Sequence, residues 1–254
     1  MIEVRDLAVT FNPGTALETR ALRGIDLTIP EGQFVTVIGS NGAGKSTLLG
    51  ALAGGAGEDV TPLPAASRAR LVARVFQDPL ASSCESLTLE ENLALASARG
   101  RRRGLALALR GRDREAWRGT LASLGLGLEG RLGDRMGLLS GGQRQAASLL
   151  MATLAPIKVL LLDEHTAALD PRTAESVVDL TRRLVAEGCL TTLMITHSMQ
   201  QAIALGDRLL MLHEGQVVLD HAGPAKAGLT VRDLLDEFAR LRGGRLDEDA
   251  LLLG

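Results

Sequence analysis

Residues 39–46 read Gly-Ser-Asn-Gly-Ala-Gly-Lys-Ser, and this glycine-rich segment constrains the fold more than any other part of the chain. It matches the pattern G-x-x-x-x-G-K-[ST] at every fixed position. The five residues before it, 34–38, are mostly apolar and β-branched, which favours a buried strand. A helix is predicted from Lys45 to Ala53. A strand, a tight glycine turn and a helix in this order predict a loop that binds a nucleoside triphosphate.

In a loop of this kind the main chain holds the anion. Glycines let the chain fold tightly, so that several N–H groups point inward, and the helix N-terminus adds its positive end. We expect Lys45 to reach the β- and γ-phosphates and the Ser46 hydroxyl to bind Mg²⁺. The motif alone does not say how the energy is used. The nucleotide-binding residues predicted here are Gly39, Ser40, Asn41, Gly42, Ala43, Gly44, Lys45, Ser46 and Thr47.

Two acidic residues, Asp163 and Glu164, follow the apolar residues 159–162. The carboxyl ends of parallel strands are where such sheets bind ligands. We therefore expect Asp163 to hold Mg²⁺, directly or through water, and Glu164 to take a proton from the attacking water. Taken alone, the pair could equally well cap the next helix. The phosphate-binding motif in the same chain favours the catalytic interpretation.

The rest of the chain alternates between strand and helix patterns, with a different composition in the middle. Strands are predicted at residues 191–195 and 209–212, and residues 173–186 have helical periodicity. This alternation predicts a parallel sheet covered on both faces. Residues 87–154 are rich in Leu, Ala and Arg and poor in β-branched residues, which favours helix. A short amphipathic helix is expected at residues 231–242.

The fold class predicted is α/β, a P-loop NTPase (RecA-like) core with an inserted α-helical subdomain. The core would comprise residues 1–79 and 155–225, the helical subdomain residues 80–154, and a helical tail residues 226–254. The helical subdomain carries a basic run, formed by Arg99, Arg101, Arg102 and Arg103. Such a run is more often a solvated face than a contact with lipid headgroups or a permease loop.

Composition narrows the possible functions. The formal net charge of -2 does not mark the whole chain as a nucleic-acid binder. Cys84 and Cys189 lack the spacing of a zinc site and are too few for a disulfide framework, so we expect reduced thiols. The N-terminus does not resemble a signal peptide, and no window is apolar enough to span a membrane. If a membrane is involved, another chain must cross it.

Residues 139–143, Leu-Ser-Gly-Gly-Gln, lie between the two nucleotide motifs at the start of a predicted helix. They resemble the signature motif of ABC (ATP-binding cassette) ATPases. Gln77 resembles the family's Q-loop glutamine, and His197 its switch histidine. Phe11 stands where the family places an aromatic residue against adenine, although a lone Phe is usually a core residue. The remaining positions matched to the family's nucleotide contacts are Ser140, Gly141, Gly142, Gln143 and, in the D-loop, Asp170.

The resemblance implies an ATPase subunit of a membrane importer that works as a head-to-tail dimer. Each ATP would lie between the phosphate loop of one subunit and the signature motif of the other, with Mg²⁺ held by Ser46, Gln77 and Asp163. Glu164 would activate water, and His197 would orient it. Lys45 and Gln77 complete the catalytic set.

The partners implied are an integral-membrane permease, a second copy of the chain and, indirectly, an extracytoplasmic substrate-binding protein, with no nucleic acid. The location implied is peripheral, at the cytoplasmic face of the cell membrane. The alternative is a soluble ABC ATPase that acts on nucleic acid or the ribosome.

Several stretches look like one bacterial subgroup, whose permeases resemble those for branched-chain amino acids and ribose and of which some are tied to aromatic amino acids. His165, in place of the proline common after the glutamate, fits this subgroup. Between Ala53 and Arg74 the chain is about ten residues shorter than the family pattern, the length of one strand and a turn. We therefore expect the family's small antiparallel β subdomain to be truncated and the catalytic motifs to survive.

Overall fold

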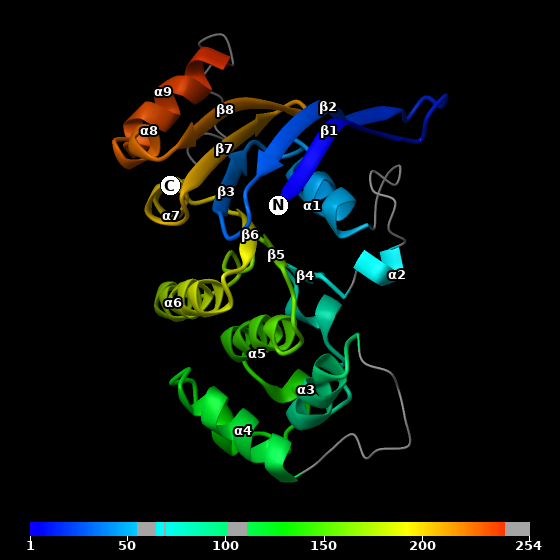
Figure 1. Cartoon of the computed structure of the whole chain (residues 1–254), viewed down its shortest axis with the longest axis vertical. Helices are drawn as coiled ribbons and strands as arrows, with labels where there is room; N and C mark the ends of the chain where they lie inside the picture. Colours follow the sequence, from blue (N-terminus) through cyan, green and yellow to red (C-terminus); the bar gives the residue numbers. More distant parts are fainter. Residues whose placement is uncertain (55–64, 69, 101–110, 242–254) are drawn as a thin grey trace. The chain divides into compact units, whose positions relative to one another are not determined.

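The structure is a computed structural model that describes residues 1–54, 65–68, 70–100 and 111–241 (Figure 1). Backbone contacts divide the chain into two compact units, one of Met1–Ala65 and Leu190–Gly254, the other of Ala66–Cys189. The two units are described separately below. The domain boundaries predicted at residues 79, 154 and 225 stay a prediction.

The first unit contains a mixed sheet in which β6, β3, β7 and β8 are successive neighbours. The first three strands run parallel to one another, and β8 is antiparallel to β7. Every residue of β3 and β6 is buried, which explains why both sequences are unbroken runs with little polarity. The strands predicted at residues 34–38, 191–195 and 209–212 are present. The bounds are β3 Phe34–Gly39, β6 Thr191–Ile195, β7 Arg208–His213 and β8 Gln216–Ala222.

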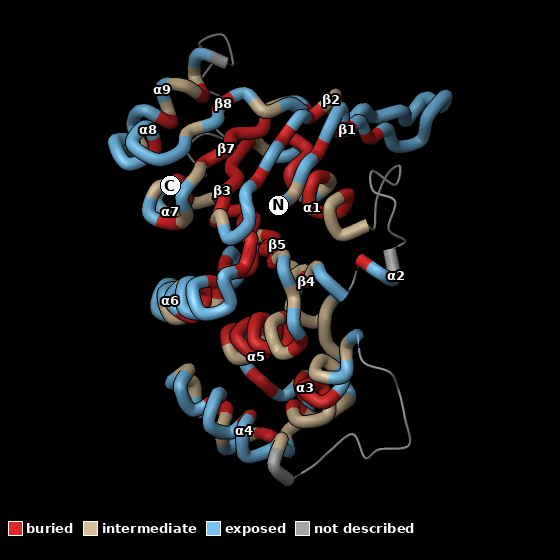
Figure 2. Tube along the Cα trace, in the orientation of Figure 1, coloured by how far each residue is buried: buried red, intermediate tan, exposed pale blue. Residues whose placement is uncertain are grey.

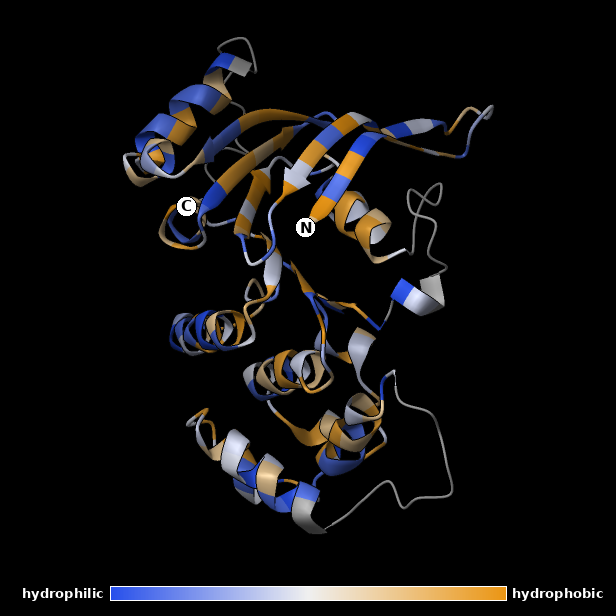
Figure 3. Ribbon diagram, in the orientation of Figure 1, coloured by the Kyte–Doolittle hydropathy of each residue, from blue (hydrophilic) through white to orange (hydrophobic). Residues whose placement is uncertain are grey.

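A second, antiparallel sheet in this unit consists of β1 (Ile2–Phe11) and β2 (Thr19–Ile29). Buried and exposed residues alternate along much of both strands, as expected for a sheet with one buried face. Figure 3 shows the matching alternation of hydropathy. In the described part of the chain, this pair represents the antiparallel β subdomain. Residues 55–64, which hold most of the shortened segment, lie outside the described residues.

The helices of the first unit are placed by glycines and by apolar contacts. Helix α1 (Lys45–Ala53) is bounded by Gly44 and Gly54, both in the left-handed conformation, and coincides with the predicted helix. Helix α9 (Val231–Leu241) matches the helix predicted at 231–242, of which residue 242 lies outside the described part. Its Leu234 and Phe238 are buried in a cluster with residues of β3, α7, β7 and β8. The remaining helices are α7 Met199–Ala204 and α8 Pro224–Ala227.

The second unit is built around a parallel pair of strands, β4 (Val72–Val75) and β5 (Val159–Asp163). Helix α5 is buried along most of its length, whereas α6 exposes much of its surface (Figure 2). The middle of the chain is helical, as predicted. Its helices are α3 Leu89–Ser97, α4 Gly111–Ala122 and α5 Gly141–Thr153, followed by α6 Pro171–Gly188. Shorter helical turns are α2 Ala65–Arg68, η1 Pro79–Ser82, η2 Leu128–Gly130 and η3 Met136–Leu138.

One expectation for the helical region is corrected. Arg99 was expected on a solvated basic face, but it is half-buried, and its Nη2 donates a hydrogen bond to the carbonyl of Ala152 at 2.5 Å. The last carbonyls of a helix have no partner within the helix, and a guanidinium satisfies one of them here. Burial lowers the pKa of Arg99. The other three arginines of the run, residues 101–103, lie outside the described residues.

Candidate functional site

The phosphate loop leaves the end of β3 through glycines that no other residue can replace. A Cβ on Gly39, whose φ is 149°, would lie 2.1 Å from the carbonyl oxygen of Leu212. A Cβ on Gly44, whose φ is 96°, would lie 2.4 Å from the carbonyl oxygen of Ala21. Both contacts are with main-chain atoms, so the clash could not be relieved by turning a side chain. These two glycines therefore fix the path of the loop against β2 and β7.

Lys45 is held by the loop that it follows. Its ammonium group donates hydrogen bonds to the carbonyl oxygens of Gly39 at 2.7 Å and Ser40 at 3.0 Å, and the residue is only 6% exposed. The Lys45 charge is thus fixed at the start of the turn, where the phosphates were predicted to bind. Asn41, Gly42 and Ser46 are exposed. The middle of the loop and the residue Ser46, at the start of α1, are therefore accessible to solvent.

His197 lies at the same end of the sheet as the phosphate loop. Strand β6 is the parallel neighbour of β3, with Ile195 opposite Val37, so the chain leaves both strands at one edge. The turn that carries His197 is held by Thr196, whose hydroxyl accepts from the N–H of Ser198 and donates to Gln201 Oε1. His197 itself is half-buried. Its predicted role as the switch histidine needs this proximity to the loop.

Phe11 ends β1, and its side chain is not part of the core. The residue is 43% exposed, in a strand where Val4, Leu7 and Val9 are buried. The exposure leaves the ring accessible to a planar ligand. The adenine contact stays a prediction.

In the second unit, the acidic pair ends β5 as expected. Asp163 is 7% exposed, and its Oδ2 lies 2.5 Å from Arg74 Nη2 on the neighbouring strand β4. Glu164 has a φ of 47°, a conformation that costs free energy in any residue other than glycine. Its carbonyl accepts from the N–H of Ala167 at 3.0 Å, which closes a turn directly after the strand. The turn fixes Glu164 in this strained position, as is common for residues that act in catalysis.

His165, next in the chain, is a buried neutral residue. It is 2% exposed, and burial lowers its pKa to about 4. Its Nε2 lies 3.0 Å from the Thr181 hydroxyl, which itself donates to the carbonyl of Val177. Because that hydroxyl proton is used, Nε2 carries the imidazole proton and donates. His165 therefore anchors the turn after β5 to helix α6.

The signature residues form the start of helix α5. Ser140 is the N-cap, and the Ser140 hydroxyl accepts from the N–H of Gln143 while the Gln143 side chain accepts from the N–H of Ser140. Gln143 also donates to the carbonyl of Leu126 and accepts from Arg131. Ser140 and Gly141 remain exposed. The result is a rigid helix N-terminus open to solvent, suited to an anion.

Gly142 is needed for packing within this unit. A Cβ there would lie 2.0 Å from Cγ2 of Thr173, on helix α6. Asp170 caps α6, where its side chain accepts from the N–H of Thr173 at 3.1 Å. Hydrogen bonds to Thr173 lower the pKa of Asp170. The first turns of α5 and α6 therefore meet, and they bring the signature motif and the D-loop together.

The segment around Gln77 is attached to helix α5 by two buried polar side chains, Gln145 and Ser148. Gln145 Nε2 donates to the carbonyl of Phe76 at 3.3 Å, and the Ser148 hydroxyl donates to the carbonyl of Pro79 at 3.3 Å. Both side chains are buried, at 1% and 2% exposure. Gln77 itself is exposed. Arg74, Gln145 and Ser148 are the residues that sequence reasoning missed.

The predicted site residues thus fall into two sets. The first unit holds Phe11, the phosphate loop and His197, and the second holds Gln77, residues 140–143, the acidic pair and Asp170. Among the described residues, no group of three or more His, Cys, Asp or Glu side chains could hold a metal ion. In the same part of the chain, no helix is long and apolar enough to cross a membrane.

Comparison with known proteins gives consistent matches. The family model for ABC transporters matches residues 22–167. The chain is 42% identical over 248 residues to the tyrosine transport ATP-binding protein of Clostridioides difficile (strain R20291), which covers 94% of this chain and 98% of that protein. It is 38% identical over 208 residues to the aliphatic sulfonates import ATP-binding protein SsuB of Escherichia coli (strain K12), covering 80% and 75%.

Solved structures agree with these matches. A dimeric bacterial ABC transporter cassette superposes with a TM-score of 0.73 at 27% identity, and the match covers 87% of this chain and 98% of the cassette. The same cassette in a dimeric post-hydrolysis state, bound to ADP and phosphate, gives a TM-score of 0.72 at 26% identity, with the same coverage.

Proposed function

The chain belongs to the ABC transporter family, as an ATP-binding subunit, and from that premise we propose that it hydrolyses ATP to drive import of an amino-acid-like solute through a separate permease. The observation that carries the proposal is the start of helix α5. There Ser140 and Gln143 cap the helix reciprocally, Ser140 and Gly141 are exposed, and Gly142 packs against α6. The Ser-Gly-Gly-Gln sequence in this position resembles the signature motif, which is absent from most other proteins with a phosphate loop.

The residues of the chain supply the chemistry of hydrolysis. The main chain of the phosphate loop and the fixed ammonium of Lys45 bind the phosphates and offset their negative charge. Glu164 takes a proton from the attacking water, and the turn after β5 fixes its backbone for that task. His197, in the turn that follows β6, orients the water. A positioned base of this kind contributes about 10²–10⁴-fold to the rate.

The residues predicted to hold Mg²⁺ fit that ion chemically. Ser46, Gln77 and Asp163 offer a hydroxyl, an amide and a carboxylate oxygen, all hard ligands, and Mg²⁺ in nucleotide sites takes only one or two carboxylates because the phosphates supply other ligands. The ion would neutralise charge that develops on the phosphates.

The working form proposed is a head-to-tail dimer. In this arrangement Ser140 and the Gly142 N–H of one copy face the γ-phosphate bound by the other. The exposed N-terminus of α5 supports the arrangement, and the similar cassettes were solved as dimers. Closure on ATP and opening after hydrolysis would supply the mechanical stroke.

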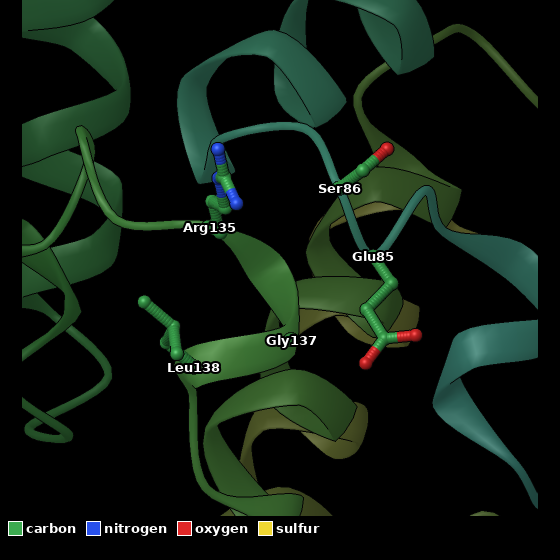
Figure 4. Close-up of a pocket in the computed structure, with 5 residues that line it drawn as sticks. All are labelled: Glu85, Ser86, Arg135, Gly137 and Leu138. Atoms are coloured by element: carbon green, nitrogen blue, oxygen red, sulfur yellow. The ribbon is translucent and has the colours of Figure 1, made fainter.

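A pocket in the second unit is the surface that we propose for the permease (Figure 4). It has a volume of about 520 Å³ and is lined by Glu85, Ser86, Arg135, Gly137 and Leu138. Leu138 is 70% exposed. The pocket joins the segment after the Q-loop to the segment before the signature motif, so a permease seated there would contact both.

The finer assignments rest on resemblance. The tyrosine transport relative supports an amino-acid-like, and specifically an aromatic, solute. Membership of the subgroup with branched-chain amino acid and ribose-type permeases, a substrate-binding protein outside the membrane, and a place on its cytoplasmic face belong to the same proposal. The importer relatives favour this function over a soluble ABC ATPase that acts on nucleic acid or the ribosome.

The test is a pull-down with a tagged Glu164→Gln variant, expressed in native membranes and kept in ATP. The variant should keep ATP binding, lose turnover and trap the dimer with its permease, which mass spectrometry would identify. The matched control is Glu187→Gln, a change on an exposed residue of α6 that should leave turnover intact. Recovery of ribosomes or DNA in place of a multi-spanning protein would refute the transport function. Undiminished hydrolysis by Glu164→Gln would refute the general-base assignment.

A further inference from the structure

Arg74 reaches the carboxylate of Asp163 because of the register between two parallel strands. Arg74 of β4 lies opposite Leu161 of β5, and Asp163 is two residues further along β5. Side chains two residues apart share one face of a strand and are separated by about 7 Å. A long side chain at position 74 spans that distance, and its Nη2 meets Asp163 Oδ2 at 2.5 Å.

The guanidinium is fixed as well as charged. The Arg74 Cζ lies 4.6 Å from the centre of the Phe76 ring, a cation–π distance, and the two paired side chains are only 19% and 11% exposed. The Arg74 Nε is buried without a hydrogen-bond partner in the described part of the chain. The other residues of β4 are Val72, Ala73 and Val75. An apolar residue at position 74 would pack on Phe76 without a desolvation cost, so packing does not account for an arginine here.

We propose that Arg74 is a positioning residue that competes with the bound metal for Asp163 and thereby sets how tightly the metal is held. This inference rests on the proposed function, in which Asp163 is a metal ligand. A divalent ion at Asp163 must share the carboxylate with a fixed positive charge. That charge orients the carboxylate, but its repulsion weakens the binding of a second cation. Weaker binding would favour release of the metal with the spent nucleotide.

The experiment measures Mn²⁺ binding to the full chain in the presence of ADP, followed by the electron paramagnetic resonance signal of free Mn²⁺. Arg74→Met keeps the length and the contact with Phe76 but removes the charge. We expect the Mn²⁺ dissociation constant to fall about tenfold or more in this variant. Arg74→Lys keeps a charge and should stay within roughly threefold of wild type. Arg118→Met, which removes an exposed ion pair on α4, is the matched control and should change nothing.

The outcomes separate this inference from the function on which it rests. If the wild-type chain with ADP binds no Mn²⁺, or if Asp163→Asn binds it as well as wild type, the metal-ligand assignment fails and the inference fails with it. If wild type binds Mn²⁺ through Asp163 but Arg74→Met binds it equally or more weakly, only the inference is overturned. A lysine variant as tight as the methionine variant would also overturn it. Thermal unfolding without metal establishes that each variant is folded.

Discussion

Gly142→Ala tests how the signature helix is packed. The new Cβ would lie 2.0 Å from Cγ2 of Thr173 but 3.3 Å from its Cβ and 3.6 Å from its Oγ1. The clash is therefore with one methyl group. Overpacking of this kind costs about 1–3 kcal/mol. Against this, replacing glycine with alanine in a helix stabilises the helix by up to about 1 kcal/mol. We expect a net loss of about 1 kcal/mol in the free energy of unfolding.

Thr173→Ser removes the methyl group and leaves the hydroxyl. In that background Gly142→Ala should become neutral or stabilising, so the two changes should show a coupling energy of about 2 kcal/mol. The assay is urea unfolding of four proteins, namely wild type, the two single variants and the double variant, without nucleotide. Additive effects, or a Gly142→Ala variant that is stable in the wild-type background, would refute the argument that Thr173 requires the glycine.

Three further predictions concern other parts of the site. The folded-state pKa of His165, about 4, lies below its ordinary value of 6.5, so the unfolded chain binds more protons between these pH values. The free energy of unfolding should therefore be highest above pH 6.5 and should fall as the pH approaches 4, with His165 accounting for a loss of about 3 kcal/mol. Urea unfolding at several pH values should show a weaker pH dependence of this free energy for His165→Asn than for wild type. An equal pH dependence in the two proteins would contradict the burial argument. Lys45→Ala should lower ATP affinity or turnover, measured by nucleotide titration and phosphate release, and normal values of both would contradict the phosphate-loop assignment. Ser140→Arg should block dimer formation in ATP, measured by size-exclusion chromatography, while ATP binding by the monomer persists; loss of that binding would contradict a contact made only across the dimer.

Elements bounded by strong local signals could be predicted from the sequence. Helix α1 has the predicted ends because Gly44 and Gly54 both take the left-handed conformation. Strands β3 and β6 were predicted because buried parallel strands are continuous apolar runs. The capping box that Thr88 and Glu91 form at the start of α3 has an equally local pattern, Thr-x-x-Glu. Strand β8 was not predicted. It exposes most of its residues, and only Leu219 is buried.

Interactions between residues far apart in the sequence could not be predicted from the local sequence pattern. Arg74 and Asp163 are 89 positions apart, and Gln145 and Phe76 are 69 apart. Nothing in the local sequence around Arg74 distinguishes a buried ion pair from a surface charge. Arg99 was misjudged for the same reason, because its partner, the end of α5, lies 53 positions away. The motif residues could therefore be named from the sequence as candidates, whereas the residues that hold them in place could not.

The hydrogen bonds from Gln145 and Ser148 end on main-chain oxygens, those of Phe76 and Pro79. A hydrogen bond to a main-chain carbonyl does not require a particular side chain on the residue that carries the carbonyl. The attachment of this segment to α5 therefore does not depend on exposed side chains near it, such as that of Ala81. Such an arrangement would let related chains vary the surface next to the Q-loop to suit different membrane partners, while Gln145 and Ser148 keep this segment attached to α5.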